Sequence, residues 1–392
     1  MAAADYMDDY THKMTWHEIE ELKEAAEQGI PGAQSKLGDC YSQGNGVRQD
    51  SAEALEWYRR AAVQGEAYAQ CAMGFSYQYG LGVEPDYAVA ADWYKKAIAQ
   101  DYLAAYSFLG ILYITGMGVE QDYNEAARLF RKGAEQGDDF AQYVLGEMYR
   151  IGLGVEKNLP EATRLYRYSA MHKNRAAEMT LTLLYGGGSC ITERSLWGID
   201  VSLCLANGDY EKASEWLTAR AKQGDRDAAF GLSVCYMTGF GARYRANKAV
   251  KYLSAAADKG DPVAQSKLAA LYIQGLVVKA NDEESVRQFR LAAEQGCADG
   301  MCGLAMCYAT GSGTERSQVE ADKWYKLAAE QYQKGVDLGD DQAMCALAYL
   351  YKEGNGVEMN TTLAKELFKK AADLGNTEAQ INFSKYEQDI NF

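Results

Sequence analysis

Proline and long apolar runs are scarce in this chain, and both absences narrow the choice of fold. Only 4 of its 392 residues are proline, which favours helices, because proline breaks a helix interior. The 38 glycines argue against long uninterrupted helices, so we expect many short helices with glycine between them. No stretch approaches the roughly 18 apolar residues of a membrane-spanning helix. The amino-terminal MAAADYMDDYTHKM holds acidic residues and no apolar run, so we expect no secretory signal there.

Basic residues are outnumbered by acidic ones. The chain has 40 Lys and Arg against 55 Asp and Glu, which gives a net charge of −15. Binding to nucleic acid depends on basic side chains that neutralise phosphates. Binding to an anionic membrane surface also depends on basic side chains. We therefore expect neither partner, and the charge itself is explained by solubility.

Histidine is too rare for most catalytic or metal sites. The three histidines are His12, His17 and His172. A zinc site needs histidines and cysteines at short spacings, whereas Cys297, Cys302 and Cys307 are five apart and would diverge around a helix. A serine or cysteine nucleophile needs a base, and His172 alone lies well inside the chain. We expect no catalytic residues, no metal, no cofactor and no enzymatic activity.

The nine cysteines do not form a disulfide framework. Their number is odd, and Cys71, Cys302 and Cys345 recur at one position of a repeat that is described below. That position falls within a predicted helix, where a free cysteine behaves as a small buried apolar residue. This pattern favours a reducing compartment and a cytoplasmic location, with a secreted effector as the alternative.

A tyrosine that returns at a constant interval is the most informative feature present. It occurs at Tyr41, Tyr77, Tyr113, Tyr149, Tyr185, Tyr236, Tyr272, Tyr308 and Tyr351. Most of these tyrosines are 36 residues apart, and a period of this length is typical of a solenoid. Two gaps are longer, one of 51 residues after Tyr185 and one of 43 residues after Tyr308.

The first full repeat, from about Gly32 to Gly65, predicts two helices. Its first helix carries Ala33, Leu37 and Tyr41 on one face and stops at the glycines of Gly44-Asn45-Gly46-Val47. Asp50, with Glu53 three residues on, has the pattern of a capping box and starts the second helix. Paired carboxylates such as Asp340-Asp341 also fall at predicted helix starts, where they complement the helix dipole.

The motif A-x-x-x-L-G-x-x-Y-x-x-G-x-G-V followed by A-x-x-W-Y-x-x-A-A-x-x-G resembles the Sel1-like repeat family, a relative of the tetratricopeptide repeat. It spans Ala33 to Gly65 and recurs over roughly residues 16–390. The resemblance implies an all-α fold, a right-handed α/α superhelical solenoid of about nine helix pairs with terminal capping helices. It also implies an adaptor role in protein complexes, without naming a partner.

The spacing also predicts how the chain is organised. We expect an extended or disordered segment at 1–14, a capping helix at 15–29, repeats 1–4 and the first helix of repeat 5 at 30–185, an insertion at 186–207, the second helix of repeat 5 and repeats 6–9 at 208–376, and a capping helix at 377–392. The insertion, which contains Trp197, either offers a binding surface or adds a helix that covers a weak junction. The seven extra residues near Tyr332 can lengthen one helix by almost two turns without rotating its buried face.

Binding residues are expected on the first helices, which line the concave side in tetratricopeptide-like arrays. The candidates lie two residues before or after the repeat leucine and one or two after the tyrosine. They are Phe75, Gln78, Tyr79, Ile111, Ile114, Tyr143, Glu147, Arg150, Met179, Leu183, Phe230, Val234 and Met237. Their apolar character predicts a groove for a peptide or helix of a partner protein, unless neighbouring helices bury these side chains.

The function hypothesis is therefore a non-catalytic scaffold or adaptor. Two alternatives stay open. One is an exported bacterial effector or a cell-wall-associated protein of the same family. The other is a scaffold that assembles with copies of itself into a homo-oligomer.

Overall fold

The structure is a computed structural model that describes residues 14–185, 198–275, 277–337 and 339–388. The described residues form 21 helices, and every regular element among them is helical. The chain divides into two compact units, residues 1–165 and 166–392, and each is described by itself. The division falls inside α9. Residues 1–13 and the part of the insertion that includes Trp197 lie outside the described residues.

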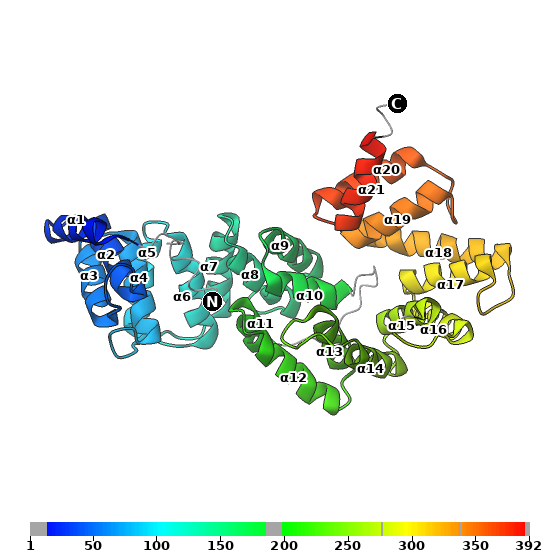
Figure 1. Cartoon of the computed structure of the whole chain (residues 1–392), viewed down its shortest axis with the longest axis horizontal. Coiled ribbons are helices and arrows are strands. Elements are labelled where there is room, and N and C mark those ends of the chain that lie inside the picture. Colours follow the sequence, from blue (N-terminus) through cyan, green and yellow to red (C-terminus); the bar gives the residue numbers. More distant parts are fainter. Residues whose placement is uncertain (1–13, 186–197, 276, 338, 389–392) are drawn as a thin grey trace. The chain divides into compact units, whose positions relative to one another are not determined.

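In both units most consecutive helices lie side by side (Figure 1). The first unit contains α1 (Trp16–Glu27), α2 (Pro31–Gln43), α3 (Ser51–Val63), α4 (Ala67–Tyr79), α5 (Tyr87–Ile98), α6 (Leu103–Thr115), α7 (Tyr123–Glu135), α8 (Asp139–Ile151) and the start of α9 (Leu159–Met171). The second contains the end of α9, α10 (Arg175–Tyr185), α11 (Ile199–Ala206), α12 (Tyr210–Lys222), α13 (Arg226–Thr238), α14 (Ala246–Asp258), α15 (Pro262–Gln274), α16 (Asp282–Glu294), α17 (Ala298–Thr310), α18 (Gln318–Asp337), α19 (Asp341–Glu353), α20 (Thr361–Asp373) and α21 (Thr377–Gln388).

The repeat motif forms a pair of helices joined by a glycine turn, as α4 and α5 illustrate. Helix α4 ends at Gly80, whose φ of 69° lies in the left-handed region that glycine enters without strain. Helix α5 begins after Asp86, whose carboxylate accepts hydrogen bonds from the backbone N–H groups of Ala88 and Val89. The predicted stop and start signals are thus confirmed in this repeat.

Close packing within a pair depends on the small residue that follows the repeat leucine. In α4 this residue is Gly74, and a Cβ added there would lie 2.6 Å from the ring of Tyr94. The Tyr94 ring is fully buried, and its hydroxyl donates to Gln78 Oε1 at 2.7 Å. A protein interior has few voids into which such a ring could shift, so the glycine lets the two helices approach closely.

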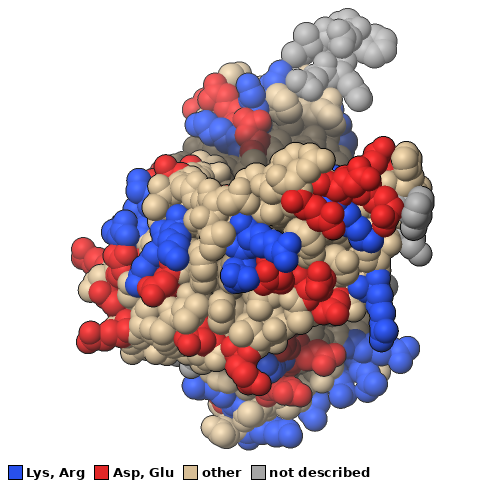
Figure 2. Space-filling view, turned by 90° about the vertical axis from the view of Figure 1, so that its left-hand side faces the viewer, with Lys and Arg blue, Asp and Glu red and all other residues tan. Residues whose placement is uncertain are grey.

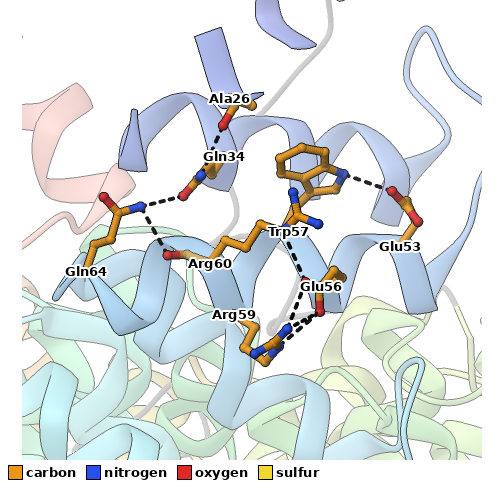
Figure 3. A network of polar contacts seen from close by, with 8 residues as sticks. All are labelled: Ala26, Gln34, Glu53, Glu56, Trp57, Arg59, Arg60 and Gln64. Atoms are coloured by element: carbon orange, nitrogen blue, oxygen red, sulfur yellow. Dashed lines mark hydrogen bonds and ion pairs between the residues drawn. The ribbon is translucent and has the colours of Figure 1, made fainter. Parts of the chain in front are cut away.

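A pair of glutamines recurs within the repeats, and its first member also reaches the preceding helix. Gln34 Nε2 in α2 donates to the carbonyl of Ala26 in α1 at 3.0 Å, and Gln64 Nε2 donates to Gln34 Oε1 at 2.7 Å (Figure 3). Gln100 donates in the same way to Gln70 in the next repeat. The Gln34 amide adds a second donor to the Ala26 carbonyl, which already accepts from the backbone N–H of Gly29.

The capping box predicted for α3 is confirmed only for its first residue. The Asp50 carboxylate does cap the helix, since it accepts from the N–H groups of Ala52 and Glu53. The Glu53 carboxylate, however, accepts from Trp57 Nε1 at 3.2 Å (Figure 3). The indole N–H lies one turn further along the same helix and competes for the carboxylate. A complete capping box occurs instead at α1.

The second unit accommodates extra residues in two ways. Helix α18 has 20 residues where the second helices of other repeats, such as α16, have 13. Its added turns bury Tyr332, whose hydroxyl donates to Asp299 Oδ1 at 2.8 Å, so the predicted lengthening is confirmed. In the described part of the insertion, residues 199–206 form the short helix α11.

On the face shown in Figure 2, acidic and basic side chains are intermixed, and several lie next to each other. Among the described helices, none combines the length and the apolarity that crossing a bilayer requires.

Candidate functional site

Most of the predicted groove residues are part of the core. Nine of them are buried: Gln78, Ile114, Tyr143, Glu147, Arg150, Met179, Leu183, Phe230 and Val234. The expectation that these side chains are exposed is therefore wrong. The physical reason is that first helices of consecutive repeats contact each other, as α4 and α6 do in the first unit and α10 and α13 do in the second.

The buried polar members of this set have structural partners. Gln78 accepts the hydroxyl of Tyr94. Glu147 and Arg150 form an ion pair within α8, with Arg150 Nη2 at 2.7 Å from Glu147 Oε2. Both side chains are buried, so we interpret the pair as part of the α8 packing.

Three accessible groove residues gather on neighbouring helices of the first unit. Tyr79 on α4 is 48% exposed, and its ring centroid lies 4.5 Å from that of Phe75, which is half-buried. The Phe75 ring contacts Phe108 of α6 at 5.5 Å, and the half-buried Ile111 lies one turn further along α6. We call Phe75, Tyr79 and Ile111 the α4–α6 patch.

The second unit also exposes apolar side chains on its first helices. Met237 on α13 is 48% exposed, as predicted for a groove residue. Met306 on α17 is exposed as well and occupies the same repeat position as Phe75 and Ile111. Met306 is not among the residues predicted from the sequence, which lie in the second to sixth repeats, although its repeat position was a sufficient signal.

The second unit also contains a buried ionic cluster that was not predicted from the sequence. Arg167 at the end of α9 lies with its Nη2 atom 3.1 Å from Asp341 Oδ1 and 3.6 Å from Asp340 Oδ1. Asp340 caps α19, as its position at a helix start predicted. Arg167 lies far from Asp340 in the sequence, so the spacing of residues did not indicate that the two would form an ion pair.

Cysteines and acidic residues do not assemble a metal site in the described part of the chain. The eight cysteines there are all free. Burial raises the pKa of the Cys235 and Cys345 thiols to about 12. Because the thiolate is the reactive form, we expect both thiols to react slowly near neutral pH.

Thiol labelling tests this assignment. At pH 8, iodoacetamide should leave Cys235 and Cys345 unmodified in the folded protein, because both thiols are buried and protonated. The partly exposed Cys204 serves as the comparison within the same unit. In urea without reductant, intact mass should show adducts on all nine cysteines. Rapid labelling of Cys235 in the folded state would contradict the structure, and missing adducts in urea would reveal a disulfide.

Sequence comparison finds the same repeats. The Sel1 repeat family matches residues 31–66, 67–102, 103–138, 139–174, 226–261, 262–297, 298–333 and 341–376. The predicted number of pairs was about nine, and the pair formed by α10 and α12 falls between the matched segments, where α11 interrupts the pattern.

Solved structures give further similarity. The chain is 30% identical to a protective antigen present in uropathogenic Escherichia coli strains that displays an SLR fold, with a TM-score of 0.45, over 94% of this chain and 82% of that one. It is 26% identical to a Sel1 repeat protein from Oxalobacter formigenes, with a TM-score of 0.40, over 74% of this chain and 96% of that one. A search of the curated proteins found no match.

Proposed function

The chain belongs to the Sel1 repeat family, and from this premise we propose that it is a non-catalytic scaffold that binds a segment of a partner protein on the first helices of its repeats. Proteins built from Sel1 and tetratricopeptide-like repeats are in general protein-interaction scaffolds. The finer proposal concerns where this chain binds and what kind of segment it takes.

The observation that carries the proposal is the α4–α6 patch. Three apolar side chains on the neighbouring helices α4 and α6 stay at least partly accessible, although an isolated fold would gain by covering them. Tyrosine and phenylalanine are favoured in the cores of protein interfaces. An extended or helical segment that crosses α4 and α6 would cover all three side chains.

Aspartate substitutions in the patch test this function. The double variant Tyr79→Asp/Ile111→Asp should weaken binding of a partner at least tenfold, because the loss of a hot-spot residue at the centre of an interface costs about 2 kcal/mol or more. Phe75 is left unchanged, since its contact with Phe108 contributes to packing. Partners are identified by affinity purification with the native chain from its own organism, and each affinity is then measured with purified proteins.

The control is Val63→Asp, which places one aspartate at an exposed apolar position on α3, a second helix. This variant should bind as the native chain does, and all variants should keep their helical circular dichroism. Full binding by the double variant would overturn the α4–α6 patch as the binding surface. Light scattering over a concentration series distinguishes a partner protein from a second copy of this chain.

A further inference from the structure

The second unit contains a cavity that the proposed scaffold function does not use. Its volume is about 610 Å³, within the range of small-molecule sites. The ends of five helices surround it. The lining residues that matter for its chemistry are Arg167 and Met171 of α9, Glu178 and Leu181 of α10, Asp340 and Asp341 at the start of α19, and Asp373 and Leu374 at the end of α20.

Charge in this cavity is strongly unbalanced. Four carboxylates, from Glu178, Asp340, Asp341 and Asp373, line it together with one cation, Arg167. Arg167 is engaged with Asp340 and Asp341 through the contacts given above. The cavity therefore carries an excess of negative charge that its own residues do not neutralise.

Asp340 shows the imbalance most directly. The residue is only 2% exposed, and its Oδ2 atom has no hydrogen-bond partner among the described residues. Burial raises the pKa of this carboxyl to about 6, although the neighbouring Arg167 acts in the opposite direction. A buried carboxylate with an unused oxygen is costly unless a further donor or cation approaches it.

Two other features favour a cation with an aliphatic stem. Helix α20 ends at the cavity with Asp373 and Leu374, and the carboxyl end of a helix carries partial negative charge. Apolar surface from Met171, Leu181 and Leu374 lies beside the charged groups. Lysine and arginine side chains combine an apolar stem and a cationic head in this way.

We propose that this cavity binds an alkyl ammonium or guanidinium group. The stem lies along Met171, Leu181 and Leu374, and the head reaches the carboxylates of Glu178, Asp340 and Asp373. The group is carried by a basic side chain of a partner protein or by a free polyamine. The proposal is independent of the α4–α6 patch, which lies in the other unit.

Small cationic probes test the site on the full chain. N-acetyl-arginine amide and N-acetyl-lysine amide supply the two head groups, and N-acetyl-citrulline amide supplies an uncharged analogue of the first. Isothermal titration calorimetry should show binding of the cationic probes and at least tenfold weaker binding of the citrulline probe. Added salt should weaken the binding of the cationic probes.

A pair of variants locates the binding. Glu178→Gln/Asp373→Asn removes two accessible carboxylates and should reduce the affinity about tenfold. The control Asp258→Asn/Glu294→Gln removes the same charge from exposed positions on α14 and α16 that do not line the cavity, and it should change the affinity less than twofold.

Further results of the titrations identify the ligand or overturn the proposal. Tighter binding of spermidine than of N-acetyl-arginine amide identifies a free polyamine as the occupant, and the reverse order identifies a basic side chain. Equal binding of the citrulline probe, equal loss in both double variants, or no binding of any cation at millimolar concentration overturns the proposal. None of these results bears on the Tyr79→Asp/Ile111→Asp experiment, so the two proposals fail separately.

Discussion

Replacing Gly118 by alanine is expected to lower the free energy of unfolding of the first unit by about 2–5 kcal/mol. Gly118 follows α6 with a φ of 71°, in the left-handed region that costs alanine about 1–2 kcal/mol. A Cβ added there would also overlap the backbone of Tyr87 and Ala88 at the start of α5. Backbone atoms cannot rotate away as a side chain can, so the turn and the start of α5 must separate.

The matched control is Gly137→Ala. Gly137 has a φ of 91° and no neighbouring atom within 4 Å of an added Cβ. This variant carries the conformational cost alone, so it should be about 1–3 kcal/mol more stable than Gly118→Ala. Urea unfolding followed by circular dichroism measures the difference. Hydrogen exchange should show the loss of protection centred on α5, α6 and α7, and equal unfolding midpoints for the two variants would contradict the tight contact.

Phe230→Asp is expected to unfold the helices around α13. The Phe230 ring is fully buried, and deleting a buried phenylalanine typically costs about 3–5 kcal/mol. The introduced carboxylate must in addition be buried or protonated. We therefore expect a loss of about 4 kcal/mol or more, which circular dichroism would detect as reduced helicity and a lower unfolding midpoint.

Met237→Asp is the control on the same helix. Met237 is exposed at the end of α13, so the same substitution should change the stability by about 0.5 kcal/mol or less. A Phe230→Asp chain with native stability would show that α13 is packed differently. The contrast matters for binding experiments, because a binding defect caused by Phe230→Asp would report unfolding and not the loss of a contact.

Much of the fold could be predicted from repeat positions. Gly80 and Asp86 marked the end of α4 and the start of α5 because each satisfies a local backbone requirement. The small residue at Gly74 and the aromatic ring of Tyr94 likewise recur at regular positions, so their close contact was implied by the pattern. Such signals are local, and a period of 36 residues repeats them.

The candidate site was harder to predict for a physical reason. Tyr79 and Tyr143 both satisfy the sequence rule for a groove residue, yet Tyr79 is exposed and Tyr143 is fully buried. Exposure depends on how closely the next first helix approaches, and this distance follows from the packing of many side chains. The amino-acid composition of one repeat does not determine the distance between neighbouring first helices.

The sequence alone determined the helical class, the pairing of helices and most of their ends, because capping, turn formation and packing within a pair involve residues close together in the chain. Only the tertiary structure decided which apolar positions remain accessible. It alone also brought Arg167 beside Asp340 and Asp341. Burial and ion pairing of this kind arise between residues far apart in the chain. Local sequence patterns therefore do not predict which of these residues come into contact.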